Sequence, residues 1–226
     1  MLIVALAATA TTVAIAPPAR ADMVLSEVIV NLPAGEVRKE IVVSNTGEEV
    51  LFVTATLSEV LDAGLPTERR IEHDDPEAAG LIVTPNRVIV QPGQRKTLRI
   101  ANIGQTPAQD RVYRLLVNPS VGDIGAESTM LRVLVAYDVL VVVEPAEPAF
   151  ELDWTRDGTS LVLTNRGNSN VLLQNGSICP AGGGECIEVP GRRVYPGATV
   201  TIELPAAEGA VSFLASGAGQ HVQATF

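Results

Sequence analysis

The chain has 226 residues, of which 46% are hydrophobic and 19% charged, a composition typical of one large or two ordinary globular domains. Lysine and arginine total 16 against 26 acidic residues, and the net charge of −10 argues against a surface that grips nucleic acid or inserts stably into an anionic membrane. Two histidines and two cysteines are too few for the usual metal sites, and no phosphate loop, G-x-S-x-G or H-E-x-x-H motif occurs. We therefore expect no metal, no cofactor, no catalytic residues and no enzymatic activity.

The N-terminal segment predicts export. Residues 1–16 are almost wholly apolar, too short for a comfortable membrane span, and are followed by the small-x-small sequence Ala19-Arg20-Ala21. Residues 1–21 therefore resemble a secretory signal peptide cut before Asp22, which predicts a periplasmic location. No basic residue precedes the apolar run, which leaves open a start upstream of Met1. The alternative is a buried N-terminal strand or a membrane anchor.

The rest of the chain alternates with a period of two, which is typical of strands. Runs rich in Val, Ile, Leu and Thr are bounded by Gly, Pro, Asn or Asp, and no window carries a capped helical stripe. The predicted strands lie at residues 24–30, 37–44, 51–57, 87–90, 96–101, 111–117 and 130–143, and then at 150–154, 160–164, 171–173, 199–204, 211–215 and 222–226. We therefore expect an all-β protein.

A proline-rich break divides the strands into two groups. Residues 144–148 read Glu-Pro-Ala-Glu-Pro, and prolines cannot donate to a strand ladder. About seven strands precede the break and six or seven follow it, which is the count expected of two immunoglobulin-like sandwiches. We predict a first domain at residues 22–144, a hinge at 145–148 and a second domain at 149–226, that is, two tandem immunoglobulin-like β-sandwiches.

The longest predicted strand has two halves of different character. In its first half, Leu131, Val133 and Val135 make one continuous apolar face, whereas the second half is apolar on both faces. An all-apolar strand is typical of the centre of a sheet. A strand with a single continuous apolar face could lend that face to a partner.

Two cysteines in an exported protein favour a disulfide. Cys179 and Cys186 are separated by a segment with three consecutive glycines, which lets the chain fold back far enough for the two side chains to meet. The alternative is a pair of free thiols.

Four segments together resemble a known family. They are TPNRVIVQPGQRKTLRI (residues 84–100), RVYRLLVNP (111–119), the long strand ending in Glu144-Pro145, and the stretch from LTNRGNSNVLL through both cysteines to VPGRRVYPGATVTIEL (163–204). In this order they are similar to the PapD-like periplasmic chaperones of chaperone–usher pilus assembly, especially the branch serving archaic or spore-coat-U-like pili. The resemblance covers essentially the whole mature chain.

The resemblance implies a two-domain, boomerang-shaped fold and a mechanism. Such a chaperone completes a pilus subunit that lacks its last strand and delivers it to an outer-membrane usher. The matching donor residues are Thr129, Leu131, Val133 and Val135. The alternative is that these side chains fill only the protein's own core.

One departure from the family concerns the anchor for the subunit's C-terminal carboxylate. The family holds that group with two basic residues, and the matching positions here are Ile29 and Leu140, which cannot bind it. Arg111 and Arg114 begin the predicted partner of the long strand near the hinge and are candidate replacements, projecting to opposite faces. The alternative is that they are ordinary surface arginines.

The competing function is that of a structural protein or adhesin built from tandem immunoglobulin-like domains. Such a fibre component is expected to lack a complete sandwich and to carry a free N-terminal donor segment. This chain has a full strand count in its first domain, which favours the chaperone.

Overall fold

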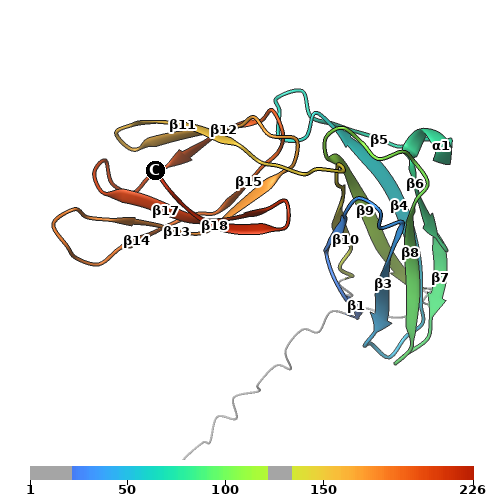
Figure 1. The fold of residues 1–226 in the computed structure, drawn as a ribbon. Coiled ribbons are helices and arrows are strands. Elements are labelled where there is room, and N and C mark those ends of the chain that lie inside the picture. The colour runs from blue at the N-terminus through green and yellow to red at the C-terminus, as the bar shows by residue number, and fades with distance from the viewer. Residues whose placement is uncertain (1–21, 122–133) are drawn as a thin grey trace, which may run out of the picture.

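The computed structural model describes residues 22–121 and 134–226, and almost every element in this part of the chain is a β-strand. The strands form four sheets, which pack in pairs as two sandwiches set at an angle to each other (Figure 1). The predicted all-β fold of two tandem sandwiches in a boomerang arrangement is confirmed. The predicted signal peptide at residues 1–21 lies outside the described residues.

The first sandwich pairs a four-stranded sheet, in the order β1-β3-β8-β6, with a six-stranded sheet, in the order β2-β10-β9-β4-β5 with β7 also on β4. The strands are β1 (Met23–Leu25), β2 (Ile29–Leu32), β3 (Arg38–Asn45), β4 (Leu51–Leu61), β5 (Arg69–Ile71), β6 (Leu81–Thr84), β7 (Arg87–Val90), β8 (Arg95–Asn102), β9 (Arg111–Val121) and β10 (Tyr137–Val143). Alternate residues of these strands fill the core between the sheets, as Ile41 on β3 and Leu98 on β8 do.

The first predicted strand, residues 24–30, is wrong as a single element. The chain forms β1 and β2 in different sheets, with β1 antiparallel to β3 and β2 parallel to β10. The physical reason lies at Ser26, whose Oγ accepts the hydrogen bond of the Val42 backbone N–H at 3.0 Å. The Ser26 hydroxyl thus accepts the Val42 N–H, which a continuing β1–β3 ladder would pair with a backbone oxygen. The ladder ends here, and the chain crosses to the other sheet.

Strand β10 is buried on both faces. Val139, Val141 and Val143 belong to the core of the sandwich, whereas Leu140 and Val142 lie in a smaller apolar cluster on the outer face of the sheet. This agrees with the all-apolar second half of the predicted strand. The ladder begins at Tyr137, and residues 134–136 are outside it.

The second sandwich consists of a three-stranded sheet, β11-β12-β16, and a five-stranded sheet, β14-β13-β17-β18 with β15 also on β13. Its strands are β11 (Leu152–Asp157), β12 (Ser160–Asn165), β13 (Val171–Cys179), β14 (Ile187–Val189), β15 (Arg192–Val194), β16 (Thr199–Glu203), β17 (Ala210–Gly217) and β18 (Gln220–Thr225). It has its own core, with Phe213 fully buried at its centre. The predicted hinge at residues 145–148 falls between β10 and β11.

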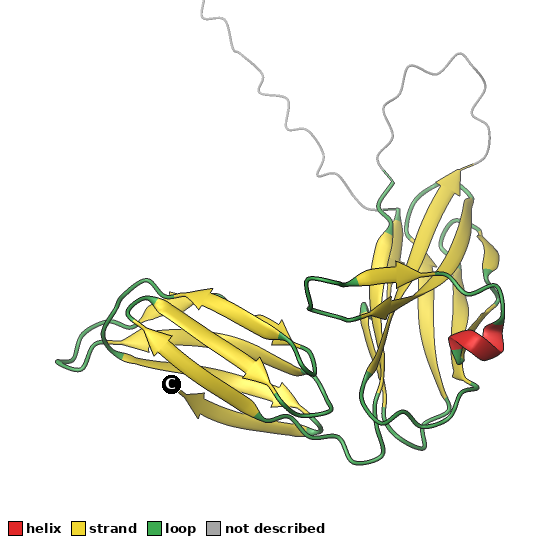
Figure 2. Ribbon diagram, turned by 90° about the horizontal axis from the view of Figure 1, so that it is seen from above, coloured by secondary structure: helices red, strands yellow, loops and turns green. Residues whose placement is uncertain are grey.

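A short helix, α1 (Pro76–Ala79), lies on the side of the first sandwich farther from the second (Figure 2). Asp75 caps it by accepting the Glu77 N–H, and Gly80 ends it with a left-handed φ of 71°. Four residues are too few to show helical periodicity in the sequence. Within the described ranges, no helix has the length and apolar character to cross a membrane.

Candidate functional site

The outer face of the six-stranded sheet, which is turned toward the second sandwich, carries the first part of the site. Ile29, Leu140, Arg114 and Ser58 are opposite one another on β2, β10, β9 and β4, and therefore share this face. Ile29 and Leu140, the positions matching the family's basic pair, are thus direct neighbours. Ile29 is 45% exposed and Leu140 is buried. The nearest basic residue in this row is Arg114.

Arg114 is half-buried and keeps most of its hydrogen-bonding capacity. Its Nη1 donates to the backbone oxygen of Asp138 at 3.4 Å. The Asp138 carboxylate is engaged by Arg70 instead, in a two-point ion pair with its shorter contact at 2.8 Å. Among the described residues, no carboxylate lies within ion-pair distance of Arg114.

Arg111 projects to the opposite face and is fully engaged there. Its Nε and Nη2 donate to Glu59 Oε1 at 2.9 and 2.8 Å, and its guanidinium lies 5.4 Å from the centre of the Tyr113 ring. Glu59 is 8% exposed and also contacts His73 Nε2 at 2.7 Å. The two candidate arginines therefore differ: Arg111 neutralises a buried carboxylate, and Arg114 faces the cleft.

We expect Arg111→Ala to lower the stability of the first domain by about 3 kcal/mol, because it leaves the buried Glu59 carboxylate without its guanidinium. Arg114→Ala is expected to change stability by less than about 0.5 kcal/mol, since it breaks no ion pair. Urea unfolding followed by circular dichroism measures both. Equal stability of the two variants would contradict this assignment of roles.

The predicted donor residues lie at the edge of what the structure describes. Thr129, Leu131 and Val133 are outside the described residues, whereas Val135 is described and is 44% exposed. Strand β10 begins two residues later, at Tyr137, and β2 pairs only with residues 140–143 of β10. The outer edge of β10 at residues 137–139 therefore has no strand beside it within the described part of the chain.

The two sandwiches are joined by a buried polar cluster around Asp110, directly before β9. Its Oδ2 accepts from Ser169 Oγ, from the Asn170 backbone N–H and from Asn170 Nδ2 at 3.3, 2.7 and 2.5 Å, and its own N–H donates to the Asn168 oxygen. Asp110 is 7% exposed, and burial raises the pKa of its carboxyl group. Asp110 thereby fixes the second sandwich against the first.

The loop after β4 reinforces this junction. Leu65 packs against the core of the second sandwich, and Ala63 and Tyr195 pack against the outer apolar cluster of Val60, Val112, Leu140 and Val142. Tyr195 follows β15 and is half-buried. The cleft thus has an apolar base where the two sandwiches touch.

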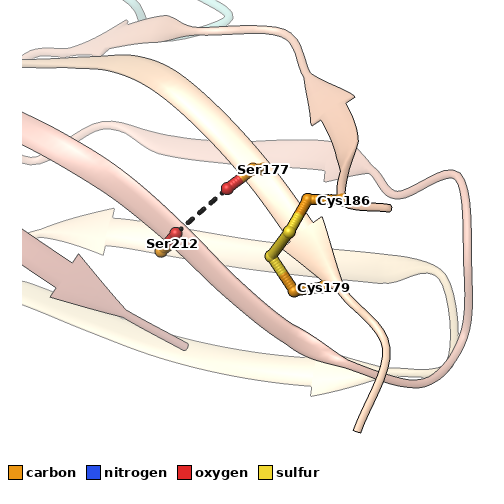
Figure 3. Close-up of a disulfide and its surroundings, with 4 residues drawn as sticks. All are labelled: Ser177, Cys179, Cys186 and Ser212. Atoms are coloured by element: carbon orange, nitrogen blue, oxygen red, sulfur yellow. Dashed lines mark hydrogen bonds between the residues drawn. A yellow bond between two sulfur atoms is a disulfide. The ribbon is translucent and has the colours of Figure 1, made fainter. Parts of the chain in front are cut away.

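The predicted disulfide between Cys179 and Cys186 is confirmed. It closes the turn between β13 and β14, with the two Cα atoms 4.3 Å apart (Figure 3). Beside it, the hydroxyl groups of Ser177 and Ser212 form a hydrogen bond of 3.2 Å between β13 and β17. The disulfide lies in the second sandwich, where it stabilises the turn between β13 and β14.

Replacing both Cys179 and Cys186 with Ser is expected to destabilise the second domain by about 2–3 kcal/mol, because the unfolded chain gains the entropy of an open loop of this length. The thermal unfolding midpoint, measured against the parent with and without reductant, reports the loss. An unchanged midpoint in the double variant would show that the disulfide does not limit stability.

Asp110 and Tyr195 were not predicted as site residues. Tyr195 is part of the stretch that resembles the family, but nothing in the local pattern shows that it faces another domain. Within the part of the chain that the structure describes, no group of three or more His, Cys, Asp or Glu side chains could hold a metal ion.

No protein-family model matches the chain. Two curated Escherichia coli proteins do, and both are described as fimbrial subunits. The one from CS1 fimbriae is 25% identical over 164 residues, which is 67% of this chain and 68% of that protein. The one from CFA/I fimbriae is 24% identical over 145 residues, which is 61% of this chain and 60% of that protein.

Solved structures match over nearly the whole length. The class 5 fimbriae chaperone CfaA aligns with a TM-score of 0.65 and 19% identity, covering 90% of this chain and 98% of its own. A chain of the Salmonella enterica complex of SafA pilin with the SafB chaperone gives 0.66 and 17% over 93% and 98%. A chain of the CsuC–CsuE complex from the archaic chaperone–usher Csu pili of Acinetobacter baumannii gives 0.63 and 14% over 91% and 98%. The predicted resemblance is confirmed: the chain has the two-sandwich fold of the PapD-like periplasmic chaperones of the chaperone–usher pathway.

Proposed function

We propose that this protein is a periplasmic chaperone that binds pilus subunits, completes each subunit by donor-strand complementation and delivers it to an outer-membrane usher. The fold supports this proposal, because its structural neighbours include chaperones in complexes described as containing a pilin or a tip subunit. Export through the predicted signal peptide at residues 1–21 belongs to the same proposal. The function needs no cofactor, because it consists of strand pairing and side-chain burial.

The observation that carries the proposal is the free edge of β10 next to an exposed apolar side chain. Residues 137–139 have no neighbour on that edge among the described strands, and Val135 is exposed just before them. Exposed edges with apolar side chains are rare in isolated proteins because they promote aggregation. We infer that a subunit pairs with this edge and that residues 129–135 supply the alternating side chains.

Arg114 is our candidate anchor for the subunit's C-terminal carboxylate. It shares a face with Ile29 and Leu140 and has no carboxylate partner among the described residues, whereas Arg111 is held by Glu59. A guanidinium can bind a carboxylate at two points.

Co-expression with the pilus-subunit genes neighbouring this gene tests the function. We expect a tagged protein to purify from the periplasm in a 1:1 complex with one of these subunits. Recovery of the tagged protein without any subunit, while the subunits accumulate as aggregates, would contradict the proposal.

The second candidate, a structural component of a fimbria or an adhesin, is supported by the descriptions of the two curated relatives. A structural component is incorporated into the surface fibre. Antibody labelling of intact cells separates the two functions: a chaperone stays in the periplasmic fraction, whereas a fibre component is found on the surface.

A further inference from the structure

Two carboxyl groups are opposite each other where the two sandwiches meet. The ladder between β9 and β10 ends with Arg111 opposite Val143, so the next residues, Asp110 and Glu144, continue the register as a pair. The backbone N–H of Asp110 donates to the second sandwich and that of Glu144 donates to β2, so neither is used between the two strands. This is the pattern of a non-hydrogen-bonded antiparallel pair, in which the two side chains come closest.

Both side chains are on the face turned toward the second sandwich. Asp110 is two residues before Val112 and Glu144 two residues after Val142, and both valines belong to the apolar cluster on that face. Glu144 lines a cavity of about 500 Å³ between the sandwiches, together with Asn170. Asp110 lines a second cavity, of about 260 Å³. The carboxyl pair therefore lies at the junction, between these two cavities.

Neither carboxyl group of the pair forms an ion pair within the described ranges. Arg193, which lines the larger cavity, donates to Asn170 Oδ1 and not to a carboxylate. Asp110 accepts three hydrogen bonds on Oδ2 from Ser169 and Asn170, whereas its buried Oδ1 has no hydrogen-bond partner among the described residues. Asp110 is 7% exposed and Glu144 is half-buried. Two adjacent carboxylates that are removed from water and lack a cation repel each other strongly.

The surroundings of the pair favour the protonated forms. Burial raises the pKa of Asp110, and this outweighs its hydrogen bonds and the charge of Arg193, which lower it. Burial also raises the pKa of Glu144, and the charge of Asp110 raises it further. The other charged or titratable groups around the pair are Asp62 and Glu68 of the loop after β4, Glu59 and Arg111, which bind each other, Arg114 of β9, Tyr195 after β15, and His221 of β18.

We propose that Asp110 and Glu144 form a proton-dependent contact between the sandwiches: the pair holds one proton while the sandwiches touch, and loss of that proton loosens the junction. A proton on Oδ1 of Asp110 displaces none of the three hydrogen bonds on Oδ2. Without the proton, two negative charges face each other, and separation of the sandwiches lets water reach both. This inference does not depend on the proposed function.

The direction of the pH dependence follows from the two raised pKa values. The closed junction holds its proton to higher pH than separated sandwiches would, so the proton favours the closed arrangement. The contribution is complete below the ordinary values of 3.8 for Asp110 and 4.5 for Glu144, and it is lost as the pH rises through the raised values. The sandwiches should therefore be held most firmly in acid.

Carbon-13 NMR of the side-chain carboxyl groups of the full chain tests the pairing, with a titration from about pH 3 to about pH 8. Asp110→Asn should lower the titration midpoint of Glu144 by at least about 0.5 pH unit, about a threefold change in proton affinity, because it removes the neighbouring charge. Glu147→Gln is the matched control, since Glu147 is an exposed carboxylate of the hinge, and it should leave the midpoint of Glu144 unchanged. An unshifted midpoint in Asp110→Asn would overturn the pair.

Small-angle scattering over the same pH range tests the effect on the junction. The radius of gyration of the parent and of Glu147→Gln should increase as the pH rises. Glu144→Gln, which keeps the size of the side chain and cannot ionise, should keep its low-pH value throughout. A parent whose radius is independent of pH, or a Glu144→Gln variant that expands as the parent does, would overturn the proposal.

Discussion

Val135→Asp is expected to abolish capture of the subunit without unfolding the free protein. The Val135 side chain is 44% exposed, so an aspartate there remains hydrated in the absence of a partner. In a subunit groove the same aspartate would forfeit the burial of an apolar side chain and place a charge in an apolar site. We expect a loss of about 3 kcal/mol in binding, more than a hundredfold in Kd. Pull-down from the periplasm and titration of the purified pair measure it.

Ala136→Asp is the matched control, because Ala136 is also exposed, is adjacent, and points to the other side of an extended chain. It introduces the same charge and should weaken binding by less than tenfold. Equal losses in the two variants would show that a negative charge at either position weakens binding, and would contradict the insertion of alternate side chains into the subunit.

Asp110→Ala is expected to lower stability by about 3 kcal/mol, as much as Arg111→Ala, by loosening the contact between the sandwiches. It leaves the buried N–H groups of Asn170 and the Ser169 hydroxyl without their acceptor. Asp110→Asn should cost much less: Oδ2 accepts all three bonds, and the buried Oδ1 has no hydrogen-bond partner among the described residues. Urea unfolding gives both values, and small-angle scattering reports whether the domains separate. If the Asp110→Ala variant kept the stability and the domain arrangement of the parent, other contacts would be shown to set the angle between the domains.

The pH dependence of the Asp110→Asn effect follows from the sign of the pKa shift. Burial raises the pKa of Asp110 above its ordinary value of 3.8, so the folded protein holds this proton to higher pH than the unfolded chain does. The contribution of Asp110 to stability is therefore complete below pH 3.8 and is lost as the pH rises through the raised pKa. The stability of Asp110→Asn relative to the parent should thus increase from pH 4 toward pH 7. A difference that is constant over this range would contradict a raised pKa.

Much of the fold could be predicted from the sequence because period-two alternation reports directly on burial. Leu98 and Ile100, which alternate with polar residues in the predicted strand at 96–101, are fully buried on β8, and the all-apolar end of β10 is covered on both faces. The disulfide was predictable because the glycine-rich spacer allowed it. The break between β1 and β2 was missed, because it depends on a side chain of Ser26 that bonds to another strand.

The candidate site was only partly predictable because its parts meet across the domain junction. The sequence placed Arg111 and Arg114 on opposite faces but could not indicate which one a buried Glu59 would hold. The sequence around Asp110 gave no indication of its role, since that role arises from hydrogen bonds to Ser169 and Asn170, about 60 positions away. Local periodicity carries no information on such contacts.

Amide hydrogen exchange on the purified complex tests the central claim, strand donation, most directly. If the segment from residue 129 to residue 139 pairs with a subunit, its amides should exchange at least a hundredfold more slowly in the complex than in the free protein, because main-chain hydrogen bonds protect them. The exposed strand β18 should show no change. Unchanged exchange at residues 129–139 in a stable complex would contradict the account.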